Sequence, residues 1–205
     1  ATIVFNNLDQ KSVDDGIANY KAIGIEARGY VCDVTDEPGV QAMIKQIKED
    51  VGSVDILVNN AGIIKRTPMI EMAVADFRQV IDIDLTAPFI MAKAVLPDMI
   101  EKRSGKIINI CSMMSELGRA TIIPYTASKG AVKMMTRGLA AELGKHNIQV
   151  NAIGPGYFAT EINAALIADE AFSNWVCTRT PAGRWGETKE LAGAAIFLSS
   201  AASDY

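Results

Sequence analysis

Short apolar runs alternate with longer amphipathic segments along the chain. The apolar runs predict strands at Thr2–Asn6, Glu26–Asp33, Asp55–Asn59, Lys106–Cys111 and Ile148–Ile153. The segments between and after them predict helices at Ser12–Ile23, Glu37–Val51, Ala73–Glu101, Tyr125–Gly144 and Thr188–Ser199. A bend is expected in the third helix at Pro88 or Pro97. Because the strands are apolar throughout and helices separate them, the pattern predicts an α/β fold in which helices cover both faces of a parallel sheet.

Composition narrows the class of protein. A chain of 205 residues has room for one domain with one core, and its net charge of −4 offers no basic stripe for nucleic acid. No apolar run is long enough to cross a membrane. The three cysteines lack the spacing of a metal site or a disulfide framework, which predicts buried thiols, no metal and a cytoplasmic protein.

Polar and small residues lie where the apolar runs of the predicted strands end. They are Asn7, Asp33, Asn59 to Gly62, Ser112 and Gly154 to Gly156. In an open parallel sheet, ligands bind beyond the carboxyl ends of the strands. The sequence therefore predicts a binding site at this edge.

Tyr125 and Lys129 stand four residues apart on a predicted helix, so they share one face. A neighbouring ammonium lowers the pKa of a phenol, which makes the pair a proton donor or acceptor for interconverting an alcohol and a ketone. Ser112, at a strand end, can hydrogen-bond the same substrate oxygen. The alternative is a half-buried tyrosine beside a lysine that reaches solvent.

The sequence resembles the short-chain dehydrogenase/reductase family over nearly its whole length. The residues that carry the resemblance are Asn59-Asn60-Ala61-Gly62, Ser112, Tyr125 to Lys129, Asn151 and Pro155-Gly156. The resemblance implies a Rossmann-type doubly wound sheet, an NAD(P)-dependent oxidoreductase and a homotetramer. It also implies Tyr125 as the acid/base, Lys129 as the ligand of the nicotinamide ribose and Ser112 as the residue that positions the substrate oxygen. Further cofactor contacts implied by it are Asn7, Asp33, Val34, Asn60, Ala61, Gly62, Pro155, Gly156, Tyr157 and Thr160.

The chain departs from the family pattern in two places. The Gly-rich turn after the family's first strand is absent, so we expect residues 1–205 to be a single NAD(P)-binding Rossmann domain that lacks its first and last strands, with two strand edges left unpaired. Asp84 stands where the family has a catalytic asparagine, whose main-chain carbonyl holds a relay water. Asp84 can keep that role; the alternatives are a locally capped helix residue and a catalytically silent nucleotide-binding module.

Three stretches, Asn59–Met72, Ile81–Phe89 and Ile108–Arg119, are similar to gluconate 5-dehydrogenases. That similarity implies interconversion of D-gluconate and 5-keto-D-gluconate in carbohydrate metabolism. The alternatives are a 2-dehydro-3-deoxy-D-gluconate 5-dehydrogenase and a 3-oxoacyl carrier-protein reductase. A sugar acid carries a carboxylate, for which arginine is a natural partner.

We expect Arg66 to anchor the substrate carboxylate, ahead of Arg119 and Arg184. Met114 is expected to line the pocket, and the segment from Tyr157 to Arg184 to form a lid packed by two tryptophans. Asn7 is neutral and would not repel a 2′-phosphate, but no arginine is adjacent to it. The similarity to gluconate 5-dehydrogenases, which generally use NADP(H), implies NADP(H) rather than NAD(H).

Overall fold

The computed structural model describes residues 1–205 and contains every predicted strand. The strands are β1 (Ile3–Asn7), β2 (Ala27–Val31), β3 (Ile56–Asn59), β4 (Gly105–Ile110) and β5 (Ile148–Ile153). All strand pairs are parallel: β1 with β2, β3 with β4, and β4 with β5. Their carboxyl ends therefore meet at common edges, as the α/β pattern predicted.

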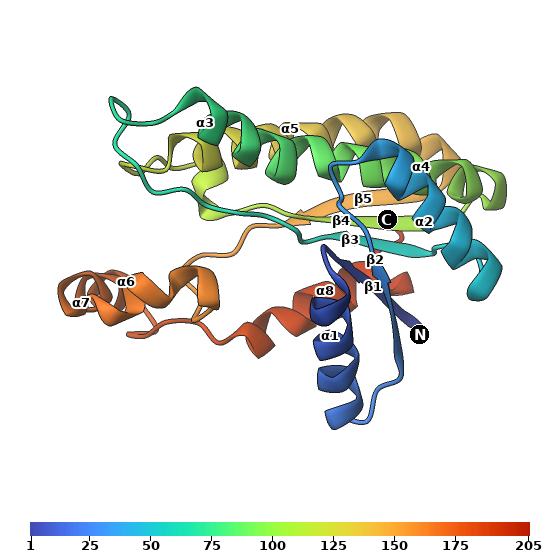
Figure 1. Ribbon diagram of the computed structural model, residues 1–205, viewed down its shortest axis with the longest axis horizontal. Coiled ribbons are helices and arrows are strands. Elements are labelled where there is room, and N and C mark those ends of the chain that lie inside the picture. Colours follow the sequence, from blue (N-terminus) through green and yellow to red (C-terminus); the bar gives the residue numbers. More distant parts are fainter.

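The strands form two sheets, β1–β2 and β3–β4–β5, and no strand pair joins them (Figure 1). The edge of β3 away from β4 has no strand neighbour. Ile56 and Val58 of β3 and Val31 of β2 are exposed, although strands of this composition are usually covered. The expectation of unpaired strand edges is confirmed.

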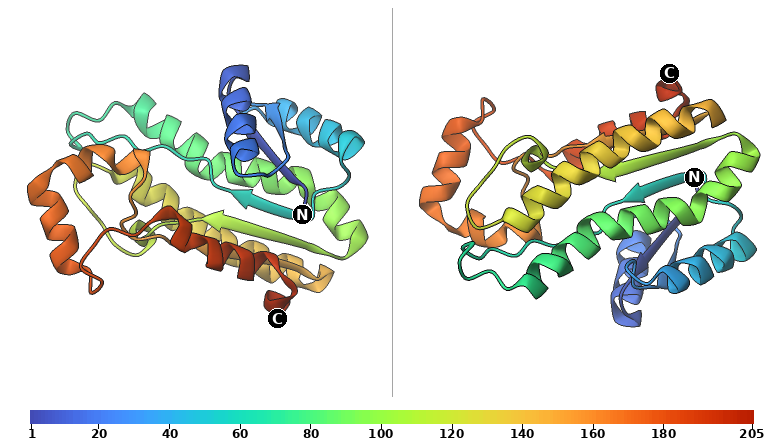
Figure 2. Two further views of the ribbon diagram at one scale, coloured as in Figure 1. Left: turned by 90° about the horizontal axis from the view of Figure 1, so that it is seen from below. Right: turned by 90° about the horizontal axis from the view of Figure 1, so that it is seen from above.

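Helices cover the three-stranded sheet on both faces (Figures 1 and 2). The eight α-helices are α1 (Gln10–Ala22), α2 (Glu37–Asp50), α3 (Val74–Ile81), α4 (Ala87–Lys102), α5 (Ile123–Leu143), α6 (Ala164–Ala168), α7 (Glu170–Arg179) and α8 (Ala192–Ser199). On one face lie α3, α4 and α5, and on the other lies α8. The pair α6–α7 extends beyond the carboxyl ends of the strands, where the sequence predicted a lid without naming its helices.

The long helix expected over Ala73–Glu101 is interrupted. A π-helical turn at Asp82–Thr86 separates α3 from α4, so the helix type changes just before Pro88, whereas α4 continues through Pro97. Within the turn, the amide of Ala87 donates to the carbonyl of Asp82, five residues earlier. Pro88 has no N–H to offer the carbonyl of Asp84, four residues before it, which favours a local change of helix type.

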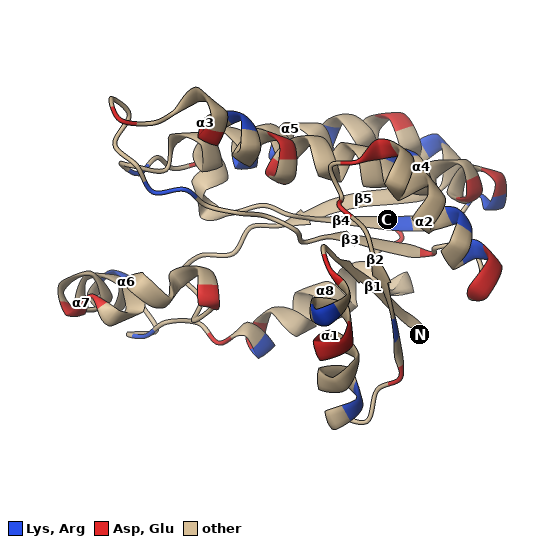
Figure 3. Ribbon diagram, in the orientation of Figure 1, with Lys and Arg blue, Asp and Glu red and all other residues tan.

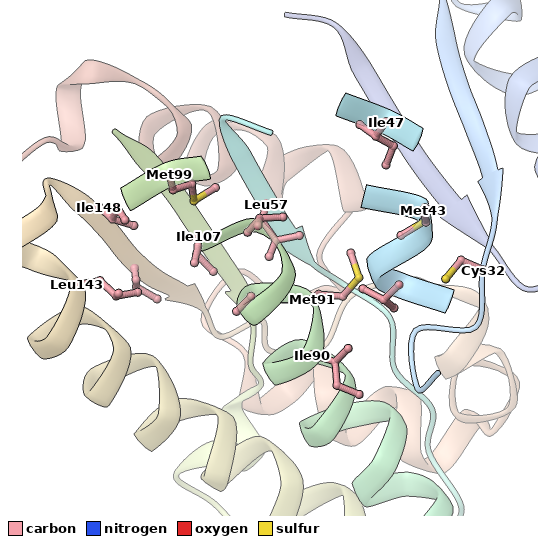
Figure 4. Close-up of a cluster of buried hydrophobic side chains, with 14 of the residues drawn as sticks. Cys32, Met43, Ile47, Leu57, Ile90, Met91, Met99, Ile107, Leu143 and Ile148 are labelled. Carbon is pink, nitrogen blue, oxygen red and sulfur yellow. The ribbon is translucent and has the colours of Figure 1, made fainter. Parts of the chain in front are cut away.

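The main core lies between the sheets and the helices above them. Fifteen buried side chains form one cluster, including Met43, Met91, Met99 and Ile107 (Figure 4). Lys and Arg are interspersed with Asp and Glu over the outer helices and loops, without a large patch of one sign (Figure 3). None of the helices has the length and hydropathy needed to cross a bilayer.

Candidate active site

A cavity of about 840 Å³ opens at the carboxyl ends of β4 and β5. That size suits a small-molecule ligand. Seven of the predicted site residues line it: Arg66, Ser112, Met114, Tyr125, Pro155, Gly156 and Tyr157. The structure therefore brings the proton-transfer candidates, the nicotinamide segment and the arginine anchor to one site.

Tyr125 lies in the first turn of α5 and is largely buried. Burial raises the pKa of its hydroxyl above the ordinary value; the Ser112 hydroxyl, as a hydrogen-bond partner, and the charge of Arg66 oppose that rise, and Asp84 adds to it. The sequence predicted a pKa lowered by Lys129. The structure corrects this expectation, because removal from water outweighs the stabilisation of the phenolate.

The position of Lys129 explains part of the difference between the predicted and the observed direction of the Tyr125 pKa shift. Its ammonium lies 5.6 Å from the centroid of the Tyr125 ring and donates a 2.9 Å hydrogen bond to the carbonyl of Ile110. The charge thus sits against the face of the ring and is hydrogen-bonded to the end of β4. Burial lowers the pKa of Lys129, and the carboxylate of Asp84 partly restores it.

Ser112 is held in position by a short capping motif. It begins a 3₁₀ turn, where its Oγ accepts a hydrogen bond from the amide of Met114, and Oγ of Ser115 accepts one from the amide of Ser112. The hydroxyl of Ser115 also donates to the carbonyl of Lys129 at 2.8 Å. Ser115 therefore ties the Ser112 turn to α5. The spacing of the two serines was a readable capping signal that the sequence reasoning did not use.

Asp84 lies in the π turn and is fully buried. Its Oδ1 accepts a 2.7 Å hydrogen bond from the amide of Ile63, and its Oδ2 lies 3.7 Å from Nζ of Lys129. Burial raises the pKa of this carboxyl; Lys129 and the Ile63 amide oppose that rise. The side chain therefore contacts Lys129 directly, whereas the sequence assigned only the main-chain carbonyl a role.

Lys129 does not line this cavity, and neither do the other predicted cofactor residues, most of which lie at strand ends. They are Asn7, Asp33, Val34, Asn60, Ala61, Gly62 and Thr160. The side chain of Asn7 accepts from the amide of Leu8, and that of Asp33 accepts from the amide and hydroxyl of Thr35. Both polar groups thus shape the turns that follow β1 and β2.

A buried polar chain beneath the site was not found from the sequence. Nδ2 of Asn59 donates to Oδ1 of Asn109 at 2.8 Å, and Nδ2 of Asn109 donates to Oγ1 of Thr136 at 2.9 Å. These three buried residues join β3, β4 and α5. The apolar runs around them hid this signal, because polar residues inside such runs do not reveal their partners.

Arg66 and Arg119 lie at the same cavity, and neither forms an ion pair. Arg66 donates to the carbonyl of Ile162 at 3.0 Å; burial and then the charge of Arg119 lower the pKa of its guanidinium. Arg184 differs, because it forms a two-bond ion pair with Glu190. Arg66 and Arg119 therefore offer positive charge to an anion, and Arg184 does not.

The predicted lid, residues 157–184, packs around an aromatic cluster. The ring of Tyr157 makes edge-on contacts with Phe172, Trp175 and Trp185. Arg119 stacks over Phe172, with its Cζ 5.2 Å from the ring centroid. A single bridge from Phe158 to Gly186 joins the start of the segment to the residues that directly follow its end. The predicted packing by both tryptophans is confirmed.

The family model for short-chain dehydrogenases matches residues 1–171 of the chain. The chain belongs to the short-chain dehydrogenase family. It is similar over its full length to a 2-dehydro-3-deoxy-D-gluconate 5-dehydrogenase of Formosa agariphila (55% identity, 78% of that protein covered) and to a 5-keto-D-gluconate 5-reductase of Escherichia coli K12 (50% identity, 81% covered). A solved structure of a gluconate 5-dehydrogenase from Burkholderia cenocepacia, in complex with NADP and tartrate, matches with a TM-score of 0.95, 48% identity, and coverage of 100% of this chain and 80% of that one.

As a member of this family, the chain is an NAD(P)-dependent oxidoreductase that acts on a CH–OH group. The cavity suits a flat nicotinamide ring. Gly156 lines it, and a Cβ placed at Gly156 would have Cγ of Met113, 3.9 Å away, as its nearest neighbour. A ring can therefore approach the backbone closely beside Tyr125.

Proposed function

We propose that this dehydrogenase interconverts D-gluconate and 5-keto-D-gluconate. The observation that carries the proposal is the placement of Tyr125, Ser112 and arginines without an ion pair, among them Arg66 and Arg119, around one cavity. The first two residues suit a reacting hydroxyl, and the arginines suit a carboxylate at the other end of the substrate. The names of the relatives, which concern gluconate and its keto and deoxy derivatives, support the same substrate class.

The proposed residue roles follow from this geometry. A bound nicotinamide supplies or accepts the hydride. Tyr125 removes the proton of the alcohol during oxidation and returns it during reduction, while Ser112 donates a hydrogen bond to the same oxygen. Lys129 contributes positive charge beneath the Tyr125 ring, and Arg66 fixes the carboxylate so that only one hydroxyl reaches Tyr125.

The test is turnover by the full-length natural protein with D-gluconate and NADP⁺, followed by the absorbance of the reduced nicotinamide. Tyr125→Phe should abolish turnover, because it removes the only acidic proton of that side chain. Tyr20→Phe, which changes a tyrosine on α1 outside the cavity, should leave turnover unchanged. Equal rates for the two variants would refute the role of Tyr125.

A second candidate substrate is 2-dehydro-3-deoxy-D-gluconate, for which the relative with 55% identity is named. Both compounds are six-carbon sugar acids and would use the same carboxylate anchor. The values of kcat/KM measured with each compound separate the two functions. A preference of tenfold or more, about 1.4 kcal/mol, would identify the physiological class.

We also propose NADP(H) as the preferred cofactor. Asn7 ends β1 with a neutral, exposed side chain, and a carboxylate at that position would repel a 2′-phosphate. The Burkholderia cenocepacia relative was solved with NADP, which supports this choice. Asn7→Asp should shift the ratio of kcat/KM values toward NAD⁺; an unchanged ratio would exclude Asn7 as a determinant.

The proposed assembly is a homotetramer in the cytoplasm. Phe89 of α4 and Ile123 and Met134 of α5 are exposed, which supports pairing of these helices between copies. All three cysteines are free thiols, in keeping with a reducing compartment. Light scattering of the purified enzyme gives its mass, and a monomer would refute the assembly.

A further inference from the structure

Asp84 is the only fully buried carboxylate of the chain. One of its oxygens has a partner, because Oδ1 accepts from the amide of Ile63, whereas Oδ2 makes no hydrogen bond. The nearest cation to Oδ2 is Nζ of Lys129, at 3.7 Å, and that lysine is itself buried. A charge removed from water persists only when an opposite charge compensates it, so each of these two groups depends on the other.

The backbone around Asp84 places its carboxylate toward α5. The residue lies in the π turn between α3 and α4, and such turns often occur at functional sites because they redirect a side chain. Gly62 also lies against the carboxylate. A Cβ at Gly62 would come within 3.3 Å of Oδ2, so the missing side chain leaves room for Asp84.

We propose that the side-chain carboxylate of Asp84 is an ionised counter-ion that positions Lys129 and sets the pH range in which Tyr125 and Lys129 work. This inference rests on the proposed roles of Tyr125 and Lys129. It makes Asp84 a positioning residue, since its carboxylate contacts Lys129 and not the reacting atoms. The charge of the side chain then matters, and an asparagine could not replace it.

The sign of the effect follows from elementary electrostatics. A fixed negative charge disfavours deprotonation of every neighbour, so it raises the pKa of both an acid that becomes anionic and a cation that becomes neutral. Asp84 acts in this direction on both neighbours: after burial and Ser112 it raises the pKa of Tyr125, and it opposes the burial that lowers the pKa of Lys129. Removal of the charge should therefore move both pKa values down.

Few other charged or titratable side chains lie near Asp84, Lys129 and Tyr125. The loop after β3 supplies Arg66, which lowers the pKa of Tyr125, and the end of β4 supplies the thiol of Cys111, which raises it. The charged side chains of α3 and α4 are directed elsewhere: Asp76 pairs with Lys65, and Lys93 pairs with Glu37. Arg78 of α3 and Asp82 of the turn itself are exposed. Asp84 is therefore the dominant anion beside Lys129.

The pH dependence of kcat/KM for alcohol oxidation tests the proposal in the full-length enzyme. Asp84→Asn keeps the shape of the side chain and removes its charge, so both limbs of the profile should move to lower pH by about 1 unit. Asp84→Glu keeps the charge, so the limbs should stay in place even where the rate falls. Asp98→Asn, a matched change at a surface ion pair, should not move them. An unmoved profile in Asp84→Asn, or a shift to higher pH, would overturn the proposal.

Infrared spectroscopy of the wild-type enzyme tests the charge without any variant and without turnover. Asp84 is the one carboxyl side chain that is removed from water, so it is the expected source of any carbonyl stretch of a protonated acid at pH 7. Absence of that band supports the counter-ion, and its presence overturns it. This measurement also separates the two proposals, because an enzyme without turnover would refute the proposed function while the spectrum still decides the charge of Asp84.

Discussion

Nδ2 of Asn59 donates a 2.8 Å hydrogen bond to Oδ1 of Asn109, and through Asn109 the contact continues to Thr136. Asn59 ends β3, Asn109 lies in β4 and Thr136 lies in α5, the helix that carries Tyr125 and Lys129. Oγ1 of Thr136 in turn donates to the carbonyl of Val132. These hydrogen-bonded side chains thus fix α5, which carries the proton-transfer residues, relative to the strands at whose ends the cavity lies.

Asn109→Ala should lower the free energy of unfolding by about 1–3 kcal/mol, because the buried amide of Asn59 and the hydroxyl of Thr136 lose their partner. Urea denaturation followed by circular dichroism measures the change. Gln149→Ala removes an exposed amide that donates to Asn147 and should leave the midpoint nearly unchanged. Equal midpoints of urea unfolding for wild type and Asn109→Ala would show that the hydrogen bonds of Asn109 contribute nothing to stability.

Arg66→Ala should raise the KM for D-gluconate at least tenfold and leave the Kd for the nucleotide unchanged, because a charge-assisted contact to the carboxylate is lost. Steady-state kinetics and a nucleotide titration measure the two constants. Arg78→Ala, an exposed arginine of α3, serves as the control. With an uncharged polyol as substrate, Arg66→Ala and wild type should have the same KM. An equal increase in KM for D-gluconate and for the polyol would argue against a carboxylate contact.

Ser112→Ala should reduce kcat by about 10²–10³-fold, the usual cost of removing one donor to a developing oxyanion. The limb of the pH profile that reports Tyr125 should also move to higher pH, because the hydrogen bond from Ser112 lowers the pKa of that tyrosine. Kinetics between pH 6 and 10, with exposed Ser104→Ala as the control, check both effects. A rate loss without a pH shift would mean that Ser112 contacts only the substrate.

Glu190 should titrate far below its ordinary range. Its hydrogen bonds from Arg184 and then from the amide of Glu187 lower its pKa from 4.5 to about 2. A depressed pKa gives stability that is present above about pH 4.5 and is lost as the pH falls toward 2. In Arg184→Ala the carboxyl signal, followed by NMR, should titrate closer to 4.5. A midpoint still near 2 would assign the shift to the backbone amide. High salt should weaken the effect, because the pair is exposed.

The alternation of apolar strands and amphipathic helices made the fold class readable from the sequence. Each predicted strand is present, and the polar and small residues that follow β4 and β5 mark the edge where the cavity lies. Ser112 at a strand end and Tyr125 on the following helix were predicted to share one substrate oxygen, and Arg66 was predicted to hold the carboxylate of the same substrate; all three line the cavity. The helices α6 and α7 were not predicted, because their side chains are mostly exposed and carry little periodic signal; Val176 is the only buried residue of α7.

The sequence by itself determined the strand and helix order, the shared face of Tyr125 and Lys129, and the chemistry available at the strand ends. These are local properties, since they depend on residue type and on spacing along one element. The tertiary structure alone decided that the Lys129 ammonium faces the carbonyl of Ile110, that burial raises the pKa of Tyr125, and that Asp84 directs its carboxylate at Lys129. Burial and electrostatic coupling depend on which distant segments pack around a group, and no spacing within the sequence records them.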